Sequence, residues 1–87
     1  MALKYWAYIF LSPGFNPDKN TVEMNSTTTR FKAVGIDMSN KEQVIDVAKQ
    51  LVAEGVQMIE LCGGFGPIWI AKVSEAINNL IPIGSVA

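Results

Sequence analysis

The chain has 87 residues, of which 49% are hydrophobic and 17% are charged, so we expect a single folded domain over residues 1–87 and not a disordered segment. A net charge of −1 offers no basic surface, which excludes the usual nucleic-acid binders. The chain has no histidine and one cysteine, Cys62, which excludes an internal disulfide, a zinc site of cysteine and histidine, and histidine-dependent nucleophilic catalysis.

The first predicted element, residues 4–11 (KYWAYIFL), is rich in aromatic and β-branched residues and apolar on both alternating faces. This pattern is typical of an interior strand that is covered above and below. The run is far shorter than the roughly 20 residues that span a bilayer, and no small-residue cleavage site follows it. We therefore expect a cytoplasmic protein that does not contact membranes.

A long connection, residues 12–29 (SPGFNPDKNTVEMNSTTT), follows the first strand. Its proline, glycine and asparagine residues favour turns, and residues 21–25 can form a short extended piece, such as one arm of a hairpin. A connection of this length is uncommon in a small domain. It is typical of a binding loop, an arm that contacts another subunit or a mobile segment.

Residues 30–36 (RFKAVGI) are predicted to form the second strand, and a helix with a clear start signal follows. Ser39 is placed to cap this helix, and Glu42, three residues later, completes a capping box. Gly55 is placed to end the helix in a left-handed conformation. The apolar residues that recur at helical spacing between these ends are Val44, Val47, Ala48, Leu51 and Val52.

Residues 56–61 are predicted to form the third strand, and the glycine-rich segment 60–67 (ELCGGFGP) leads into a second helix. Pro67 suits the first turn of that helix, where its missing N–H is not needed. The helix is expected to run to about Asn79, and residues 83–87 begin a fourth strand. The buried stripe of the second helix is predicted to consist of Trp69, Val73, Ala76, Ile77 and Leu80.

The order of these elements predicts an α/β fold, a small two-layer sandwich of four mainly parallel strands with two helices packed on one face (β-β-α-β-α-β). Strands that alternate with helices pair in parallel, and right-handed crossovers that advance in one direction place both helices on the same side. The opposite face stays apolar, for example at Tyr8, Phe10 and Val34. Because an exposed apolar face indicates association, we expect a homo-oligomer, in which the partner is the protein itself.

The loop after the third strand is the main candidate ligand site. Its backbone N–H groups belong to Gly63, Gly64, Phe65 and Gly66. They lie beyond the carboxyl end of a parallel strand and beside a helix N-terminus, which suits a small phosphate- or carboxylate-bearing metabolite. Asp37 is on the same rim, as a ligand contact or only as part of a turn. The segment is neither a P-loop nor a dinucleotide fingerprint, and a sharp turn also selects glycine without any ligand.

Glu60 and Cys62 alternate along the third strand and therefore point to one face, about 6.5–7 Å apart. They are the candidate catalytic residues, Glu60 as a general base or an anchor for a ligand amine or hydroxyl, and Cys62 as a nucleophile. Because an unpaired carboxylate is costly to bury, we expect it to meet Lys32, Arg30, a ligand or another subunit. The structural alternatives are a satisfied carboxylate and a small apolar packing residue.

Three segments, KYWAYIFLSPGFNPDK, AKQLVAEGVQMIELCGGFGP and IPIGSVA, resemble a family of short uncharacterised bacterial proteins, a domain of unknown function. The likeness covers nearly the whole chain and is most specific at residues 12–15 and 60–67. It implies a compact α/β protein and brings no activity and no catalytic residue.

Two functions remain open from the sequence. The first is binding of a small anionic metabolite at the glycine-rich loop, with or without chemistry on it. The second is a homo-oligomeric interaction module without ligand chemistry. No cofactor and no metal is expected, and the sequence does not decide whether the protein is an enzyme.

Overall fold

The computed structural model describes residues 2–86, without the side chain of Val86. Ala87, which the fourth predicted strand included, lies outside the described residues. In chain order the elements are β1 (Tyr5–Leu11), β2 (Thr21–Asn25), β3 (Arg30–Ile36), α1 (Gln43–Ala53), β4 (Met58–Cys62), α2 (Gly66–Ala76) and β5 (Ile83–Val86).

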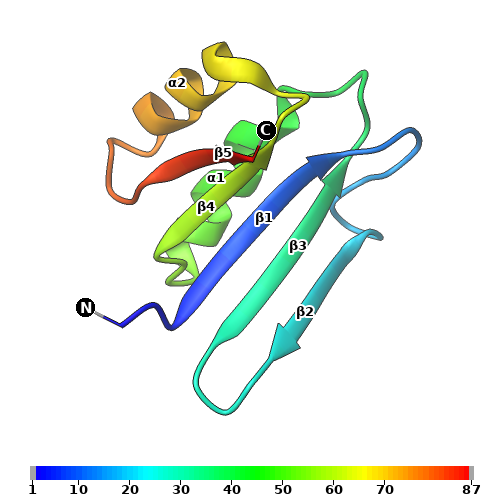
Figure 1. Cartoon of the computed structure of the whole chain (residues 1–87). Helices are drawn as coiled ribbons and strands as arrows, with labels where there is room; N and C mark the ends of the chain where they lie inside the picture. The colour runs from blue at the N-terminus through cyan, green and yellow to red at the C-terminus, as the bar shows by residue number, and fades with distance from the viewer. Residues whose placement is uncertain (1, 87) are drawn as a thin grey trace.

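The strands form a five-stranded sheet in the order β2-β3-β1-β4-β5 (Figure 1). The four predicted parallel strands are confirmed, because β3, β1, β4 and β5 all run in one direction. The extended piece at residues 21–25 is the fifth strand, β2, which pairs antiparallel with β3 at the edge of the sheet. The amide of Ser26 donates to the carbonyl of Thr29 at 2.8 Å and closes this hairpin.

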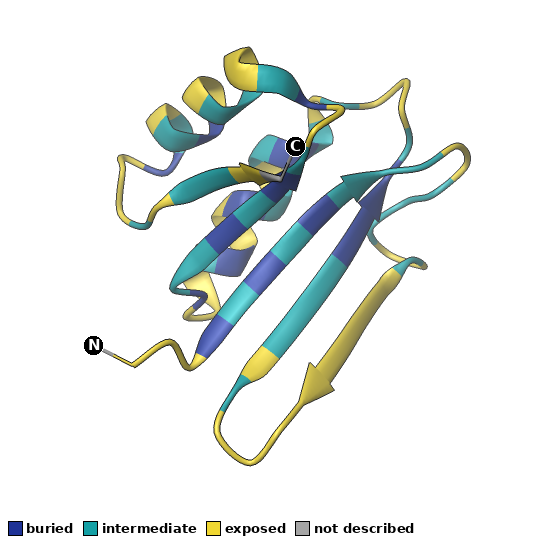
Figure 2. Ribbon diagram, in the orientation of Figure 1, coloured by how far each residue is buried: buried dark blue, intermediate teal, exposed yellow. Residues whose placement is uncertain are grey.

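The core lies between the sheet and both helices. Alternate residues of β1 point into it, which gives the banded burial along this strand in Figure 2. One cluster joins Ala7 and Ile9 of β1 to Val44 and Leu51 of α1 and to Val73 of α2. Because side chains of both helices share this cluster, the predicted placement of the two helices on one face is confirmed.

Among the described residues, no helix lies over the other face of the sheet, which we call the uncovered face (Figure 1). By strand alternation and register it consists of Trp6, Tyr8, Phe10, Val22, Met24, Phe31, Ala33, Gly35, Met58, Glu60, Cys62 and Gly84. The Trp6 and Phe31 rings lie 4.4 Å apart between centroids. Val34, which we expected on this face, lies in the core instead, because the register pairs it with the buried Ile9.

The predicted start of α1 is wrong. Ser39 does not cap the helix, because its hydroxyl donates to the carboxylate of Asp37, and α1 begins only at Gln43. Glu42 occupies the N-cap position and makes no capping hydrogen bond with its side chain. The predicted end is confirmed: Gly55 has φ of 98°, and the amide of Val56 donates to the carbonyl of Leu51 at 3.0 Å.

The second helix begins where the sequence predicts, with Pro67 in its first turn, but it ends at Ala76. Asn78 and Asn79 follow with φ of 56° and 54°, and left-handed residues cannot continue a right-handed helix. Leu80, which we expected in the buried stripe, is therefore 68% exposed. None of the helices in the part of the chain that the structure describes is long and apolar enough to cross a membrane.

Candidate functional site

The glycine-rich loop joins β4 to α2 at the rim where the parallel strands end (Figure 1). Phe65 anchors it, because its ring is buried in the core and its N–H donates to the carbonyl of Cys62 at 3.1 Å. Gly66 has φ of 78°, a conformation that favours glycine. One of the predicted anion donors is thus already engaged, while the amides of Gly64 and Gly66 donate to no acceptor among the described residues.

Lys41 brings a positive charge to this loop. Its Nζ donates to the carbonyl of Gly64 at 3.2 Å, reaching across from the turn before α1. This contact could not be predicted from the sequence, because the two residues are 23 positions apart and meet only through the crossover of α1. The loop therefore combines unengaged amides with a nearby ammonium group.

Asp37 holds the same rim together. Its carboxylate accepts hydrogen bonds from the hydroxyl of Ser39 and, at 2.8 Å, from the amide of Gly14. The hydrogen bond from Ser39, followed by that from Gly14, lowers the pKa of Asp37 below its ordinary value of 3.8. These contacts assign Asp37 to the turn after β3, and a contact between Asp37 and a ligand stays a prediction.

The two candidate catalytic residues lie on the uncovered face. Ile59 and Leu61 alternate with them and are buried on the helix side. The Sγ atom of Cys62 accepts a hydrogen bond from the amide of Leu11 at 3.4 Å, so the thiol helps to join the ends of β1 and β4. A nucleophilic role of Cys62 and a general-base role of Glu60 stay predictions.

Glu60 does not meet Lys32 or Arg30, because both of these lie on the helix side of β3, where they pair with other carboxylates. A Cβ atom added at Gly84 would lie 2.7 Å from Oε1 of Glu60, so the carboxylate rests directly on the backbone of β5. Within residues 2–86 it makes no hydrogen bond and no ion pair. Of the partners expected for Glu60, a ligand and another subunit remain.

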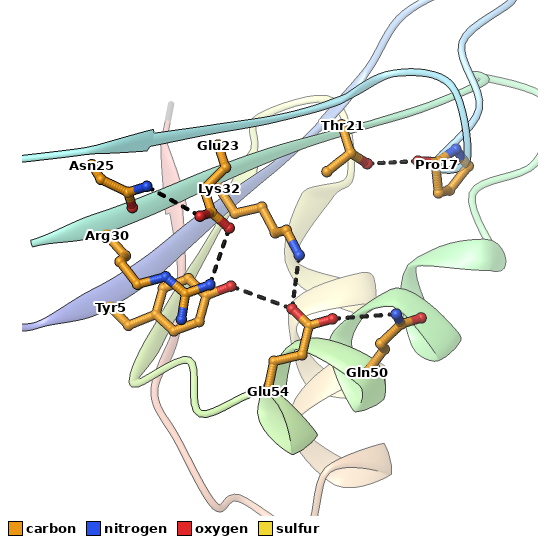
Figure 3. A network of polar contacts seen from close by, with 9 residues as sticks. All are labelled: Tyr5, Pro17, Thr21, Glu23, Asn25, Arg30, Lys32, Gln50 and Glu54. Carbon is orange, nitrogen blue, oxygen red and sulfur yellow. Dashed lines mark hydrogen bonds and ion pairs between the residues drawn. The ribbon is translucent and has the colours of Figure 1, made fainter.

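A polar network that we did not predict lies on the helix side, between the β2–β3 hairpin and the end of α1 (Figure 3). Lys32 donates to Oε1 of Glu54 at 2.8 Å, and the hydroxyl of Tyr5 donates to the same oxygen at 3.3 Å. Gln50, one turn earlier on α1, donates to Oε2 of Glu54 at 3.2 Å. The sequence near Lys32 indicates this network only by placing a lysine at a core-facing position of a strand. Its partner, Glu54, is 22 residues away in the chain.

The electrostatics of the network favour charged side chains. The hydrogen bond from Lys32 lowers the pKa of Glu54 below its ordinary value of 4.5, against the effect of burial. The same contact raises the pKa of Lys32 above 10.5. Burial, the largest cause, raises the pKa of Tyr5, whose ring also packs under the guanidinium of Arg30 at 4.1 Å. All three groups therefore keep their usual charge at neutral pH.

A cleft of about 210 Å³ opens beside this network. Its lining comprises Pro17, Asp18, Thr21, Lys32, Val34, Val47, Gln50, Leu51 and Glu54. A second hollow of about 410 Å³ adjoins it along α1 and shares Pro17, Asp18, Val47 and Gln50 with it. Gln43 lines this second hollow, and its buried Oε1 accepts no hydrogen bond from the described residues. The long 12–29 connection thus forms one wall of a groove against α1.

No curated protein and no solved structure matches the chain. Its sequence does match a protein family, and the match runs over residues 4–87, from just before β1 through β5. This agrees with the resemblance noted in three segments of the sequence. The chain therefore belongs to DUF6506, a family of unknown function.

Proposed function

We propose that the protein functions as a homodimeric interaction module, in which two copies of the chain pack together through their uncovered sheet faces. The observation that carries the proposal is the row of aromatic side chains, Trp6, Tyr8 and Phe10, on a face without a helix. Sheets of parallel strands are normally buried on both faces. A second copy would supply the missing layer.

The size of the face fits this partner. Five strands at about 4.8 Å spacing, with lengths of about 13–23 Å, give roughly 450 Å² of projected area. A standard interface buries about 800 Å² of accessible surface on each side. The accessible area of the face exceeds its projected area, because the aromatic side chains protrude from the sheet.

The charge of the face also favours a second copy over a charged partner. Among the residues that define the uncovered face, Glu60 alone is an acidic or basic residue. Cores of homodimer interfaces are depleted in charge and enriched in aromatic residues and methionine, as this face is at Phe31 and Met58.

Light scattering after gel filtration tests the proposal. The wild type is expected at twice the chain mass of 9.5 kDa, and Phe31→Glu at the mass of one chain, because a carboxylate there would be buried unpaired. Met24→Glu is the variant that cannot disturb the monomer, since Met24 is 62% exposed in one copy. Ile68→Glu on α2 is the matched control, 69% exposed and outside the face.

Either of two results would overturn the dimer. One is a monomeric wild type at about 100 μM, well above the dissociation constants of stable homodimers. The other is a dimer that survives in Phe31→Glu and Met24→Glu as it does in Ile68→Glu. Circular dichroism of each variant separates lost association from lost folding.

A second function, binding of a small anion at the glycine-rich rim, is supported by the position of Lys41. Its ammonium group lies at the carbonyl of Gly64, next to the amides of Gly64 and Gly66 at the N-terminus of α2. The amide of Gly63 completes the proposed contacts, whereas the amide of Phe65 is engaged with Cys62 and the carboxylate of Asp37 with Ser39 and Gly14. A phosphate or carboxylate group would be the ligand.

Phosphate titration followed through the amide signals of Gly64 and Gly66 tests this second function. Lys41→Met is expected to weaken binding about tenfold, the usual value of one charge-assisted contact, whereas Lys49→Met on α1 is the control. Equal affinities in the two variants would reject the site. Gly64→Val is unsuitable as a test, because a Cβ there would lie 3.2 Å from Cδ1 of Leu11 and disturb the loop itself.

A further inference from the structure

The cleft between the β2–β3 hairpin and α1 lies on the helix side of the sheet, away from both the uncovered face and the glycine-rich loop. We propose that this cleft binds a small aliphatic amino acid in its zwitterionic form. The inference does not depend on the dimer or on the anion site. It rests on three kinds of group that line the same cleft.

The first group is the ammonium of Lys32, which would bind the ligand carboxylate. Glu54 already receives three hydrogen bonds, from Lys32, Tyr5 and Gln50. Lys32 in contrast has three N–H donors, and within the described residues it uses one of them, on Glu54. Its side chain is 20% exposed and belongs to a residue that lines the cleft. A carboxylate in the cleft would give the remaining donors of Lys32 a charged acceptor.

The second group is made of acceptors, which would bind the ligand ammonium. Asp18 is one of the lining residues, and its carboxylate makes no ion pair or hydrogen bond within residues 2–86. Gln50 donates its amide N–H to Glu54, which leaves the side-chain carbonyl as a further acceptor. Asp18 belongs to the 12–29 connection and Gln50 to α1, so the two would hold the ammonium from opposite walls.

The third group is apolar and would contact the aliphatic part of the ligand. Val34, Val47 and Leu51 line the cleft between its polar ends. The cleft, of about 210 Å³, is open to solvent on one side and offers room for a compact metabolite.

The charge of the lining selects a zwitterion. Lys32 carries one positive charge, and Asp18 and Glu54 carry two negative charges, so the lining has a net charge of −1. A simple carboxylic acid would be repelled by this excess, and a simple amine would offer no acceptor to the two donors of Lys32 that Glu54 does not engage. A molecule with both groups satisfies both ends of the cleft.

Three probes of nearly equal shape test the inference by protein NMR: L-leucine, 3-methylbutylamine without the carboxylate, and 4-methylpentanoate without the amine. L-Leucine is expected to shift the signals of Thr21, the Gln50 side chain and the Leu51 methyl groups with a saturable dependence. Each of the other two probes is expected to bind at least about tenfold more weakly, because one charge-assisted contact is lost.

Variants locate the two ends of the ligand. Asp18→Asn, in an exposed loop, and Lys32→Met are each expected to weaken leucine binding about tenfold, with Lys49→Met as the control. The absence of saturable shifts at about 10 mM leucine would overturn the proposal. The proposal would also fail if either single-function probe bound as tightly as leucine, or if Asp18→Asn left the affinity unchanged.

Discussion

At the scale of single residues, two glycines within strands are explained by a side chain that packs directly against their backbone. Turn patterns in the sequence do not account for these two glycines. Gly84 leaves room for the carboxylate of Glu60, and Gly35 leaves room for the ring of Phe15, which folds back from the 12–29 connection. Phe15 in turn meets Phe10 edge-to-face at 5.7 Å between centroids. Gly35 therefore lets the long connection pack down on the sheet.

Gly35→Ala is expected to destabilise the protein by about 1–3 kcal/mol through overpacking. The added Cβ would lie 2.5 Å from Cδ2 of Phe15 and 3.1 Å from Cζ of Phe10, so the ring of Phe15 has to move. Urea unfolding measures the loss. Gly35→Ala combined with Phe15→Ala is expected to cost less than the sum of the two single changes, and strict additivity would contradict the contact.

The ion pair of Lys32 and Glu54 predicts a dependence of stability on pH. The pKa of Glu54 is lowered in the folded protein, so its charge stabilises the fold above pH 4.5, and this contribution is lost as the pH falls through the lowered value. Because the two side chains are 20% and 31% exposed, Glu54→Gln is expected to cost only about 1 kcal/mol at pH 7.

The comparison of wild type and Glu54→Gln by urea unfolding at two pH values checks this sign. Their difference in unfolding free energy is expected to be present at pH 7 and to shrink toward about zero near pH 2, where the side chain at position 54 is neutral in both proteins. Glu75→Gln, on the exposed side of α2, is the control and is expected to show no such change. A difference that stays constant with pH would disprove the role of the charge.

At the scale of elements, the two ends of α1 show which sequence signals for helix termini can be trusted. A signal that depends on one residue alone holds, whereas a signal that depends on a side-chain hydrogen bond can be overridden by tertiary contacts. Gly55 ends α1 as predicted, because a left-handed residue depends only on its own backbone. Ser39 fails as a cap, because Asp37 captures its hydroxyl and also binds the amide of Gly14 from another loop. A serine hydroxyl therefore does not cap a helix where the fold brings a carboxylate close enough to accept its hydrogen bond instead.

Gly55→Ala is expected to lower the stability by about 1 kcal/mol, since any side chain is strained at φ of 98°. Open space surrounds the site, so the cost is one of conformation and not of collision. Thermal unfolding monitors it. Gly55→Asn, which tolerates left-handed angles better, is expected to recover part of the loss, and an equal cost for both variants would contradict this reason.

At the scale of the whole molecule, the layer of helices on one side of the sheet leaves the aromatic side chains of β1 and β3 without a helix over them, and Phe15 packs against Phe10 alone among them. The same arrangement separates the proposed surfaces, because the dimer face and the amino-acid cleft lie on opposite sides of β3. Dimer formation therefore does not close the cleft, and the two proposals can be tested independently.

A dimer predicts that the melting temperature depends on protein concentration. Tenfold dilution is expected to lower the melting temperature of the wild type and of Ile68→Glu by about 3–5 °C, because association stabilises by mass action. Phe31→Glu is expected to melt at a lower temperature that does not change on dilution. A wild type without this dependence would speak against two chains unfolding together.

Much of the candidate site could be predicted at the level of backbone. The position of the glycine-rich loop, and the shared face of Glu60 and Cys62, follow from strand alternation within one short segment. The contacts of Lys41 with Gly64 and of Lys32 with Glu54 did not follow, because each joins two elements that are more than 20 residues apart. The expected partners of Glu60, Lys32 and Arg30, likewise lie on the other side of the sheet, where they pair with Glu54 and Glu23.

The sequence by itself determined the α/β class, four of the five strands, the two helices and the Gly55 terminus, because hydrophobic periodicity and turn chemistry act within a few residues. Only the tertiary structure decided the strand order β2-β3-β1-β4-β5, the side of the sheet on which Val34 and Lys32 lie, and the groove along α1. A shift of one residue in register exchanges the two faces of a strand, and register is set by partners that are distant in the chain.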